Sequence, residues 1–305
     1  MNMTEPLEFT SLRGALKRDE PLARYTSWRC GGRADRFYEP ADRDDLAVFF
    51  RQLPASEPFV VIGLGSNLLV RDGGFRGTVI LLHSVRAALE MRGGLVYAEA
   101  GVASPKVARF AALHGRGEAE FLAGIPGTIG GALAMNAGCY GGETWNHVVR
   151  VEVLTRAGVF ETRLPSEYAI GYRSVRKPDG SAPDGIFTAA WFAFPPGDGL
   201  RARARIKALL QQRIASQPLG LPNAGSVFRN PPGDHAARLI EACGLKGFAI
   251  GGAAVSEKHA NFIVNPGGRG TAADVEAVIE HVRATVHRET GVDLEPEVRI
   301  VGERA

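Results

Sequence analysis

Apolar and polar positions along the chain follow both helical and alternating patterns. Residues 42–53 have apolar positions at helical spacing, and Asp42 is placed to cap that helix. Short apolar runs at residues 58–62 and 78–82 are typical of buried strands. Ser104 is expected to cap a helix that has Pro105 at its first position. The first hundred residues therefore mix helices with strands.

Two pairs of alternating segments predict β-hairpins. Residues 87–92 and 95–100 flank Gly93-Gly94, and residues 147–155 and 159–164 flank Ala157-Gly158. The remaining patterned segments comprise three helices (198–215, 234–243, 272–289) and four strands (186–194, 249–255, 261–264, 298–301). Hairpins combined with helices predict an α+β fold rather than a doubly wound sheet. We expect three parts, residues 1–80, 81–215 and 216–305.

Glycine is the one residue whose frequency is unusual. The chain has 305 residues, of which 45% are hydrophobic and 23% charged, close to the average of folded proteins. These values exclude a disordered, a fibrous and a membrane-bundle protein. Glycine accounts for 38 residues, and 17 of them lie within residues 63–142. The excess is therefore local, as expected where backbone must approach a ligand or turn tightly.

Charge and cysteine content restrict the partners only mildly. The net charge is +3, and 30 of the 36 basic residues are Arg, which suits either phosphate binding or genome composition. No basic run with interleaved aromatic residues appears, so we expect no nucleic-acid partner. The three cysteines lack metal-ligand spacing, which predicts no metal and a reducing compartment. Without a signal-like start or a long apolar run, we expect a cytoplasmic protein with no membrane insertion.

The first glycine loop, Gly63-Leu64-Gly65-Ser66-Asn67, directly follows a predicted strand. It departs from the dinucleotide fingerprint G-x-G-x-x-G, because Leu68 stands at the third glycine position and a strand-like run follows. Its backbone N–H groups could converge on an anion, with Ser66 and Asn67 adding polar contacts. A plain tight turn is the alternative.

The second glycine loop runs from Gly124 to Ala132 and leads into an apolar segment. Pro126 and Thr128 suit the start of a helix, while Gly127, Gly130 and Gly131 leave that start free of side chains. Close packing of small residues between a helix and a sheet is the alternative. Two such loops in one half of the chain favour a single extended dinucleotide.

Six segments in a fixed order carry a resemblance to a known family. They are IGLGSNLLV, AGIPGTIGGALAMNAGCYG, YRSV, AGSVFRNP, KHANFIVN and LEPEVRIVG. The two glycine loops resemble the flavin-binding domain of vanillyl-alcohol-oxidase-like (PCMH) flavoproteins. More narrowly, the whole set resembles the UDP-N-acetylenolpyruvoylglucosamine reductase (MurB) family, in its shorter class. The resemblance implies two α+β FAD-binding subdomains followed by a C-terminal α+β substrate-binding domain.

The resemblance also implies a reaction. NADPH would reduce bound FAD, which would then reduce UDP-N-acetylglucosamine enolpyruvate to UDP-N-acetylmuramate for peptidoglycan synthesis. We expect the chain to act as a monomer. The positions implied to bind FAD lie in and beside the two glycine loops: Gly63, Leu64, Gly65, Ser66, Asn67, Leu68, Gly124, Ile125, Pro126, Gly127, Thr128, Gly130, Gly131, Ala132, Asn136 and Ala137.

Three residues line up with the family's catalytic positions. Ser226 would donate a proton to carbon, and Arg173 would bind the enolpyruvyl carboxylate and offset its developing charge. Glu297 would either donate a proton or hold Arg173. Without the resemblance, the three would read as a turn serine, a loop arginine and a strand-edge glutamate.

Further residues resemble the family's substrate contacts. Asn230 and His259 match positions near the substrate diphosphate and sugar, although His259 could equally be an ordinary polar histidine. The chain has Ser216 where the family commonly has a lysine before the linker. Arg213 or Arg229 could replace that cation. Two other classes stay open: an FAD-dependent oxidase of the same fold, and a non-catalytic nucleotide- or nucleic-acid-binding protein.

Overall fold

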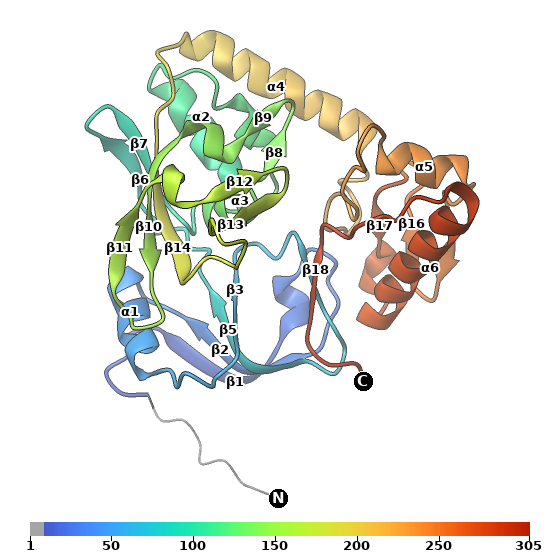
Figure 1. The fold of residues 1–305 in the computed structure, drawn as a ribbon, viewed down its shortest axis with the longest axis horizontal. Coiled ribbons are helices and arrows are strands. Elements are labelled where there is room, and N and C mark those ends of the chain that lie inside the picture. The colour runs from blue at the N-terminus through green and yellow to red at the C-terminus, as the bar shows by residue number, and fades with distance from the viewer. Residues whose placement is uncertain (1–8) are drawn as a thin grey trace, which may run out of the picture.

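The first part of the chain builds a four-stranded sheet covered by one helix. The computed structural model describes residues 9–305, and Figure 1 shows this sheet at the blue end. The strand order is β1-β2-β5-β3, antiparallel between β1 and β2 and parallel elsewhere. The bounds are β1 (Ala15–Pro21), β2 (Arg33–Glu39), β3 (Phe59–Ile62), β5 (Phe75–Leu81) and α1 (Arg43–Gln52). As predicted, Asp42 caps α1 by accepting a hydrogen bond from the backbone N of Asp45.

The second part is a five-stranded antiparallel sheet in the order β11-β10-β14-β7-β6. Both predicted hairpins are confirmed, and Gly93 and Gly94 have φ of 56° and 81°, which explains why the first turn requires glycine. The strands are β6 (Leu89–Arg92), β7 (Leu95–Glu99), β10 (Val148–Leu154), β11 (Phe160–Arg163) and β14 (Ile186–Phe192). The helices are α2 (Ser104–Leu113), α3 (Ile129–Ala134) and α4 (Gly199–Ser216). Two short antiparallel pairs complete this part: β8 (Gly138–Cys139) with β9 (Gly142–Glu143), and β12 (Ala169–Gly171) with β13 (Ser174–Arg176).

The predicted cap of α2 is wrong by one residue. Ala103 is the N-cap, and Ser104 is the first residue of the helix. The backbone N–H of Ser104 donates to the carbonyl of Gly127 at 2.9 Å, so this serine is drawn against the second glycine loop. Its buried hydroxyl has no hydrogen-bond partner among residues 9–305.

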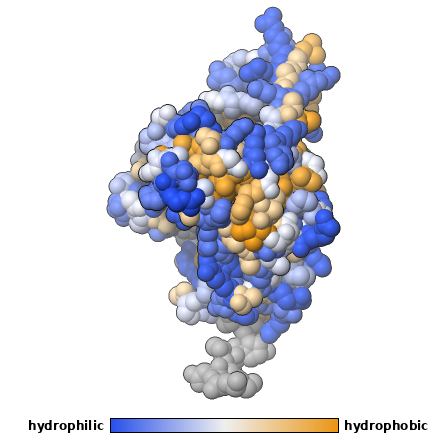
Figure 2. All heavy atoms as spheres, turned by 90° about the vertical axis from the view of Figure 1, so that its right-hand side faces the viewer, coloured by the Kyte–Doolittle hydropathy of each residue, from blue (hydrophilic) through white to orange (hydrophobic). Residues whose placement is uncertain are grey.

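The third part packs two helices on a small antiparallel sheet, β15-β16-β17. Its elements are α5 (Ala236–Ala242), β15 (Ala249–Ile250), β16 (Ala253–Val255), β17 (Ile263–Val264) and α6 (Ala272–Thr290). Figure 1 shows α4 crossing from the second part to this third part. Figure 2 faces this side of the molecule and shows one apolar area surrounded by hydrophilic residues.

The last strand returns to the first part. Strand β18 (Arg299–Val301) pairs in parallel with β4 (Leu68–Val70), the strand that follows the first glycine loop. The α+β prediction is therefore confirmed. The division at residues 80 and 215 stays a prediction, and β18 is one element of residues 216–305 that joins the first part. No helix within residues 9–305 is both long and apolar enough to cross a membrane.

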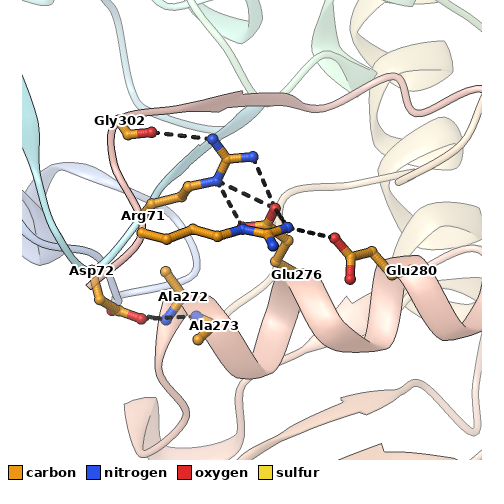
Figure 3. Close-up of polar contacts among 8 residues, drawn as sticks. Arg71, Asp72, Ala272, Ala273, Glu276, Glu280 and Gly302 are labelled. Carbon is orange, nitrogen blue, oxygen red and sulfur yellow. Dashed lines mark hydrogen bonds and ion pairs between the residues drawn. The ribbon is translucent and has the colours of Figure 1, made fainter.

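A polar cluster, which we call the α6 clamp, ties the first part to α6 (Figure 3). The Asp72 carboxylate accepts hydrogen bonds from the backbone N of Ala272 and Ala273, at 3.0 and 2.8 Å. One turn further along, Glu276 is 9% exposed and accepts from Arg71 Nε and Nη2, both at 2.9 Å. Arg304 adds a hydrogen bond to the same carboxylate at 2.9 Å. Side chains from two separate segments, residues 71–72 and Arg304, thus hold α6 beside β4.

Candidate active site

The two glycine loops lie against each other. A Cβ at Gly63 would stand 2.3 Å from Thr128 Oγ1, and a Cβ at Gly127 would stand 3.2 Å from Ser66 Oγ. Each loop therefore has a glycine, which lacks a side chain, at the point where the other loop contributes a hydroxyl group. Segments some 60 residues apart in the sequence form one cradle of backbone and hydroxyl groups, as a single extended dinucleotide such as FAD requires.

Packing explains other glycines of the second loop. The backbone N of Gly130 donates to the carbonyl of Ala100, and a Cβ at this position would lie 2.9 Å from Ala100 Cβ. A Cβ at Gly124 would lie 2.5 Å from Cys139 Sγ, which places Cys139 directly behind the loop. Helix α3 has only six residues. The close-packing interpretation therefore holds at Gly124 and Gly130, and also at Gly63, where the packed group is the Thr128 side chain of the opposite loop.

The residues implied to bind FAD differ in accessibility. Leu64 is exposed, whereas six others have buried side chains: Leu68, Ile125, Thr128, Ala132, Asn136 and Ala137. The Asn136 side chain is already engaged, donating to Glu143 Oε2 and to the Gly171 carbonyl and accepting from the Trp145 N–H. These buried residues shape the loops, and their individual cofactor contacts stay predictions.

Arg173 lies in the tight turn between β12 and β13. Its φ of 52° is uncommon for a residue with a side chain, so the surroundings must hold it there. The guanidinium donates from Nη2 to the carbonyl of Gly138 at 2.9 Å and from Nε to Glu297 Oε1 at 3.0 Å. Fixed acceptors on two sides orient the arginine, and the planar fork suits a carboxylate or phosphate.

Glu297 lies two residues before β18 and is 12% exposed. Burial raises the pKa of its carboxyl, and the nearby cations Arg173 and Arg229 oppose that shift. The carbonyl of Glu297 accepts a hydrogen bond from Asn67 Nδ2 at 3.1 Å. A side chain of the first glycine loop is therefore bonded directly to the backbone of the candidate acid.

Ser226 stands beside Glu297 because their segments pair. The Glu297 backbone N donates to the Val227 carbonyl at 2.7 Å, and Phe228 forms an antiparallel bridge with Pro296. Within residues 9–305, the half-buried Ser226 makes no side-chain hydrogen bond. The three predicted catalytic residues thus lie on three distant segments that the backbone pairing and the Arg173–Glu297 ion pair bring together.

The predicted substrate residues occupy different environments. Arg229 donates to the Arg173 carbonyl at 3.3 Å and pairs with Glu295 at 2.8 Å, so it belongs to the cluster. Asn230 Oδ1 accepts from the Ala236 N–H, which engages this amide at the start of α5. His259 packs edge-on against Phe262, and burial lowers its pKa, which favours the neutral ring. Within residues 9–305, neither Asn230 nor His259 forms a hydrogen bond with the side chain of any of the three predicted catalytic residues.

A cavity of about 530 Å³ opens between the linker after α4 and the third part of the chain. Its walls include Gln217–Leu221 and Ala254–Lys258. Lys258 Nζ donates to the carbonyl of Ile214 at 2.6 Å, two residues before Ser216. Lys258 lies within the segment KHANFIVN but is not among the predicted substrate residues. Its position next to His259, in the polar sequence Lys258-His259-Ala260-Asn261, is the sequence feature that could have indicated a substrate contact.

Arg213, one suggested replacement for the missing lysine, lies in the last turn of α4. Its Nε donates to Gln217 Oε1 at 2.7 Å, and burial lowers its pKa while Cys139 and Tyr140 oppose the shift. The other suggestion, Arg229, is paired with Glu295. Lys258 is therefore a third cation near the position of Ser216.

Comparisons with known proteins agree with this arrangement. Residues 34–162 match a family described as "FAD binding domain", and residues 217–301 match "UDP-N-acetylenolpyruvoylglucosamine reductase, C-terminal domain". Among curated proteins, the reductase of that name from Nitrosospira multiformis is 56% identical, over 99% of this chain and 94% of the relative. The one from Alkalilimnicola ehrlichii is 58% identical, over 95% of this chain and 96% of the relative.

A solved structure shows the same similarity. The UDP-N-acetylenolpyruvylglucosamine reductase (MurB) of Thermus caldophilus aligns with a TM-score of 0.78 and 32% identity, covering 95% of this chain and 99% of that one. The sequence relationships extend across both the FAD-binding and the C-terminal parts. The chain belongs to the UDP-N-acetylenolpyruvoylglucosamine reductase family, whose FAD-binding domain it carries.

Proposed function

We propose that this protein catalyses the NADPH-dependent, FAD-mediated reduction of UDP-N-acetylglucosamine enolpyruvate to UDP-N-acetylmuramate, a step of peptidoglycan synthesis. The observation that carries the proposal is the bonding of the first glycine loop to the acid–arginine pair. Asn67 Nδ2 lies 3.1 Å from the Glu297 carbonyl oxygen, and Glu297 Oε1 lies 3.0 Å from Arg173 Nε. The FAD cradle and the reducing centre are thereby adjacent.

FAD, when bound in the cradle, supplies the two-electron chemistry that amino-acid side chains lack. The opposed loops fit this group because Gly63 and Gly127 let the Thr128 and Ser66 hydroxyl groups come close to the backbone, and a Cβ at Gly131 would meet no atom closer than 4.0 Å. The protein's own task is to orient the substrate, exclude water and move a proton.

Arg173 binds the enolpyruvyl carboxylate in this mechanism. The negative charge that develops on the carboxylate during reduction is stabilised by a guanidinium held in place before the reaction. Arg173 is suited to this because the Gly138 carbonyl and Glu297 fix two of its nitrogen atoms. Its positive φ is maintained by the same contacts, so the side chain requires little reorganisation on binding.

Ser226 and Glu297 are the residues that transfer or hold protons in this mechanism. The Ser226 hydroxyl donates a proton to the substrate carbon, and the oxygen must then recover one from solvent or a neighbour. Glu297 is buried enough that its pKa is raised, which favours a carboxyl that holds a proton, while Arg173 favours the carboxylate. Burial is the larger effect, which supports Glu297 as a polarising acid beside the substrate carboxylate.

The cavity between the linker and the third part of the chain would hold the nucleotide portion of the substrate. It is bordered by Lys258, and the linker that forms one wall leads directly to Ser226. A cation there suits a diphosphate. Because Lys258 bridges to the carbonyl of Ile214, it is positioned near the site of the lysine that Ser216 replaces. We further propose that the enzyme works as a cytoplasmic monomer, where NADPH and nucleotide sugars are available.

Anaerobic titration of the purified protein tests the function. We expect a yellow protein whose visible flavin absorbance is bleached by NADPH and restored by the enolpyruvyl sugar nucleotide under nitrogen. Restoration by oxygen alone would identify an oxidase of the same fold. A colourless protein that cannot be reconstituted with FAD would overturn the assignment in favour of a non-catalytic binding protein.

A further inference from the structure

Three asparagines, of which Asn136 and Asn261 are buried, each bond to the backbone at or beside one of the catalytic residues. The Asn67 side chain bonds to Glu297, and that of Asn136 bonds to the Gly171 carbonyl in the hairpin that carries Arg173. Asn261, which no prediction assigned to the site, bonds to the segment that carries Ser226. Asn261 is 4% exposed, so its carboxamide is shielded from solvent.

The Asn261 carboxamide pairs with a peptide group as a neighbouring strand would. Its Oδ1 accepts from the Phe228 N–H at 2.9 Å, and its Nδ2 donates to the Phe228 carbonyl at 2.8 Å. The carbonyl of Asn261 also accepts from the Val227 N–H at 2.9 Å. One residue therefore satisfies three polar groups next to Ser226, and a carboxamide is needed because it offers both a donor and an acceptor.

The other edge of the same segment faces Glu297. The Val227 carbonyl accepts from the Glu297 N–H at 2.7 Å, and the Arg229 N–H donates to the Glu295 carbonyl at 2.9 Å. Residues 226–229 are thus held between Asn261 and the segment that carries Glu297, although they belong to none of the sheets of the described chain. Loss of the bonds to Asn261 would let residues 226–229 move, so that the position of Ser226 relative to Glu297 would be less fixed.

Asn261 is itself fixed by a tight loop. The Ser256 N–H donates to the Phe262 carbonyl at 2.8 Å, and the Phe262 N–H donates to the His259 carbonyl at 3.0 Å. The Asn261 N–H donates to His259 Nδ1 at 3.3 Å, so His259 supports Asn261 within this loop. The carboxamide is consequently presented in one orientation.

We propose that Asn261 is a positioning residue that sets the Ser226 hydroxyl beside Glu297. The inference rests on the proposed function, because it takes Ser226 as the proton donor. A misplacement of about 1 Å at a reacting group can lower the rate about 10²-fold without a comparable loss of substrate binding. Asn261 would therefore act on kcat far more than on KM.

The test compares Asn261→Asp with Asn265→Asp in the FAD-loaded, full-length protein. Asn265 is fully buried and also makes three side-chain hydrogen bonds, to the Trp28 carbonyl and to the backbone of Gly270. Both variants replace a buried amide donor by a carboxylate, and only the first touches the Ser226 segment. We expect Asn261→Asp to keep its FAD content and its reduction by NADPH, and to lose about 10²-fold in kcat for substrate reduction. Asn265→Asp should lower Tm without that loss.

Hydrogen exchange supplies a readout that does not depend on turnover. The amides of Val227, Phe228 and Glu297 should exchange faster in Asn261→Asp than in Asn265→Asp. If Asn261→Asp fails to fold, Asn261→Ser removes both side-chain bonds without adding a charge, and the same expectations apply. An unchanged kcat and unchanged exchange, or equal losses in both variants, would overturn the positioning role. If the wild-type protein does not reduce the substrate, the proposed function fails while the exchange comparison still decides the role of Asn261 in ordering the segment.

Discussion

Arg173 Nε and Glu297 Oε1 lie 3.0 Å apart although 124 residues separate them in the chain. The arginine comes from the β12–β13 hairpin, and the glutamate lies just before β18. Each carries a largely buried side chain, so the pair forms one unit whose members cannot be changed independently. The segment that carries Ser226 and the first glycine loop are both bonded to the backbone of Glu297, through the Val227 carbonyl and through Asn67 Nδ2.

Replacing Glu297 by Gln should slow reduction of the enolpyruvyl substrate by about 10²–10⁴, the usual contribution of a positioned acid. Gln keeps an oxygen for Arg173 Nε but cannot donate a carboxyl proton. Because burial raises the pKa of Glu297, the protonated fraction falls as pH rises through that value, and the wild-type rate should fall with it. Stopped-flow rates across pH check both points. A Gln variant that keeps the wild-type rate and pH profile would refute an acid role.

Replacing Ser226 by Ala should leave flavin reduction by NADPH intact and slow substrate reduction by about 10²–10⁴. The change removes only the hydroxyl group, while the backbone bonds of the neighbouring Val227 and Phe228 remain. The two half-reactions, measured separately under nitrogen, give the comparison. Normal turnover of the enolpyruvyl substrate by this variant would exclude Ser226 as the proton donor.

Replacing Gly63 by Ala should weaken FAD binding roughly 10-fold or more, because the new Cβ would meet Thr128 Oγ1 and push the two loops apart. The matched control is Gly117→Ala, where the nearest atom would be 3.7 Å from the new Cβ. The ratio of flavin to protein after purification and the FAD dissociation constant are the measurements. Full FAD content in Gly63→Ala would contradict the opposed-loop cradle.

Replacing Lys258 by Gln should raise KM for the nucleotide-sugar substrate roughly 10- to 100-fold, the value of a charge-assisted hydrogen bond. KM for NADPH should change little. Lys246→Gln is the control, because that lysine lies in the same part of the chain and pairs with the exposed Glu241. Equal KM values for the two variants would remove Lys258 from the substrate site.

Replacing Glu276 by Gln should lower the free energy of unfolding by roughly 1–3 kcal/mol. This range is smaller than that for a fully buried ion pair, because the side chains of Arg71 and Arg304 are 31% and 68% exposed. Hydrogen bonds from Arg71 are the main cause of the lowered pKa of Glu276 in the folded protein. A depressed folded-state pKa contributes stability that is present above the unfolded-state pKa and lost as pH falls through the folded-state value.

Urea denaturation of the wild type and the Glu276 variant, from neutral to acidic pH, measures this effect. The difference in unfolding free energy should be largest near neutrality and shrink in acid. Arg76 offers a control, since it bridges two exposed carboxylates, and Arg76→Gln should change the stability little. A Glu276 variant as stable as the wild type at neutral pH would show that the α6 clamp contributes nothing measurable.

Local patterns predicted much of the secondary structure. Asp42 caps α1, and Gly93-Gly94 turns the β6–β7 hairpin, because both depend on a few consecutive residues. The N-cap of α2 is Ala103 rather than Ser104, because Ala103 is the extended residue that forms a bridge with Thr128 of the second glycine loop. A contact from elsewhere in the chain thus outweighed a good local signal.

The amino-acid sequence by itself determined the helices, the hairpins and the two glycine loops, and its motifs named Arg173, Ser226 and Glu297. Only the tertiary structure decided that Gly63 faces Thr128, that β18 pairs with β4, that Asn261 bonds to the Ser226 segment, and that Lys258 lines the cavity next to the linker after α4. Hydrophobic period and turn chemistry act over a few neighbouring residues. Contacts between distant segments depend instead on how the whole chain packs and satisfies its buried polar groups, which no local pattern contains.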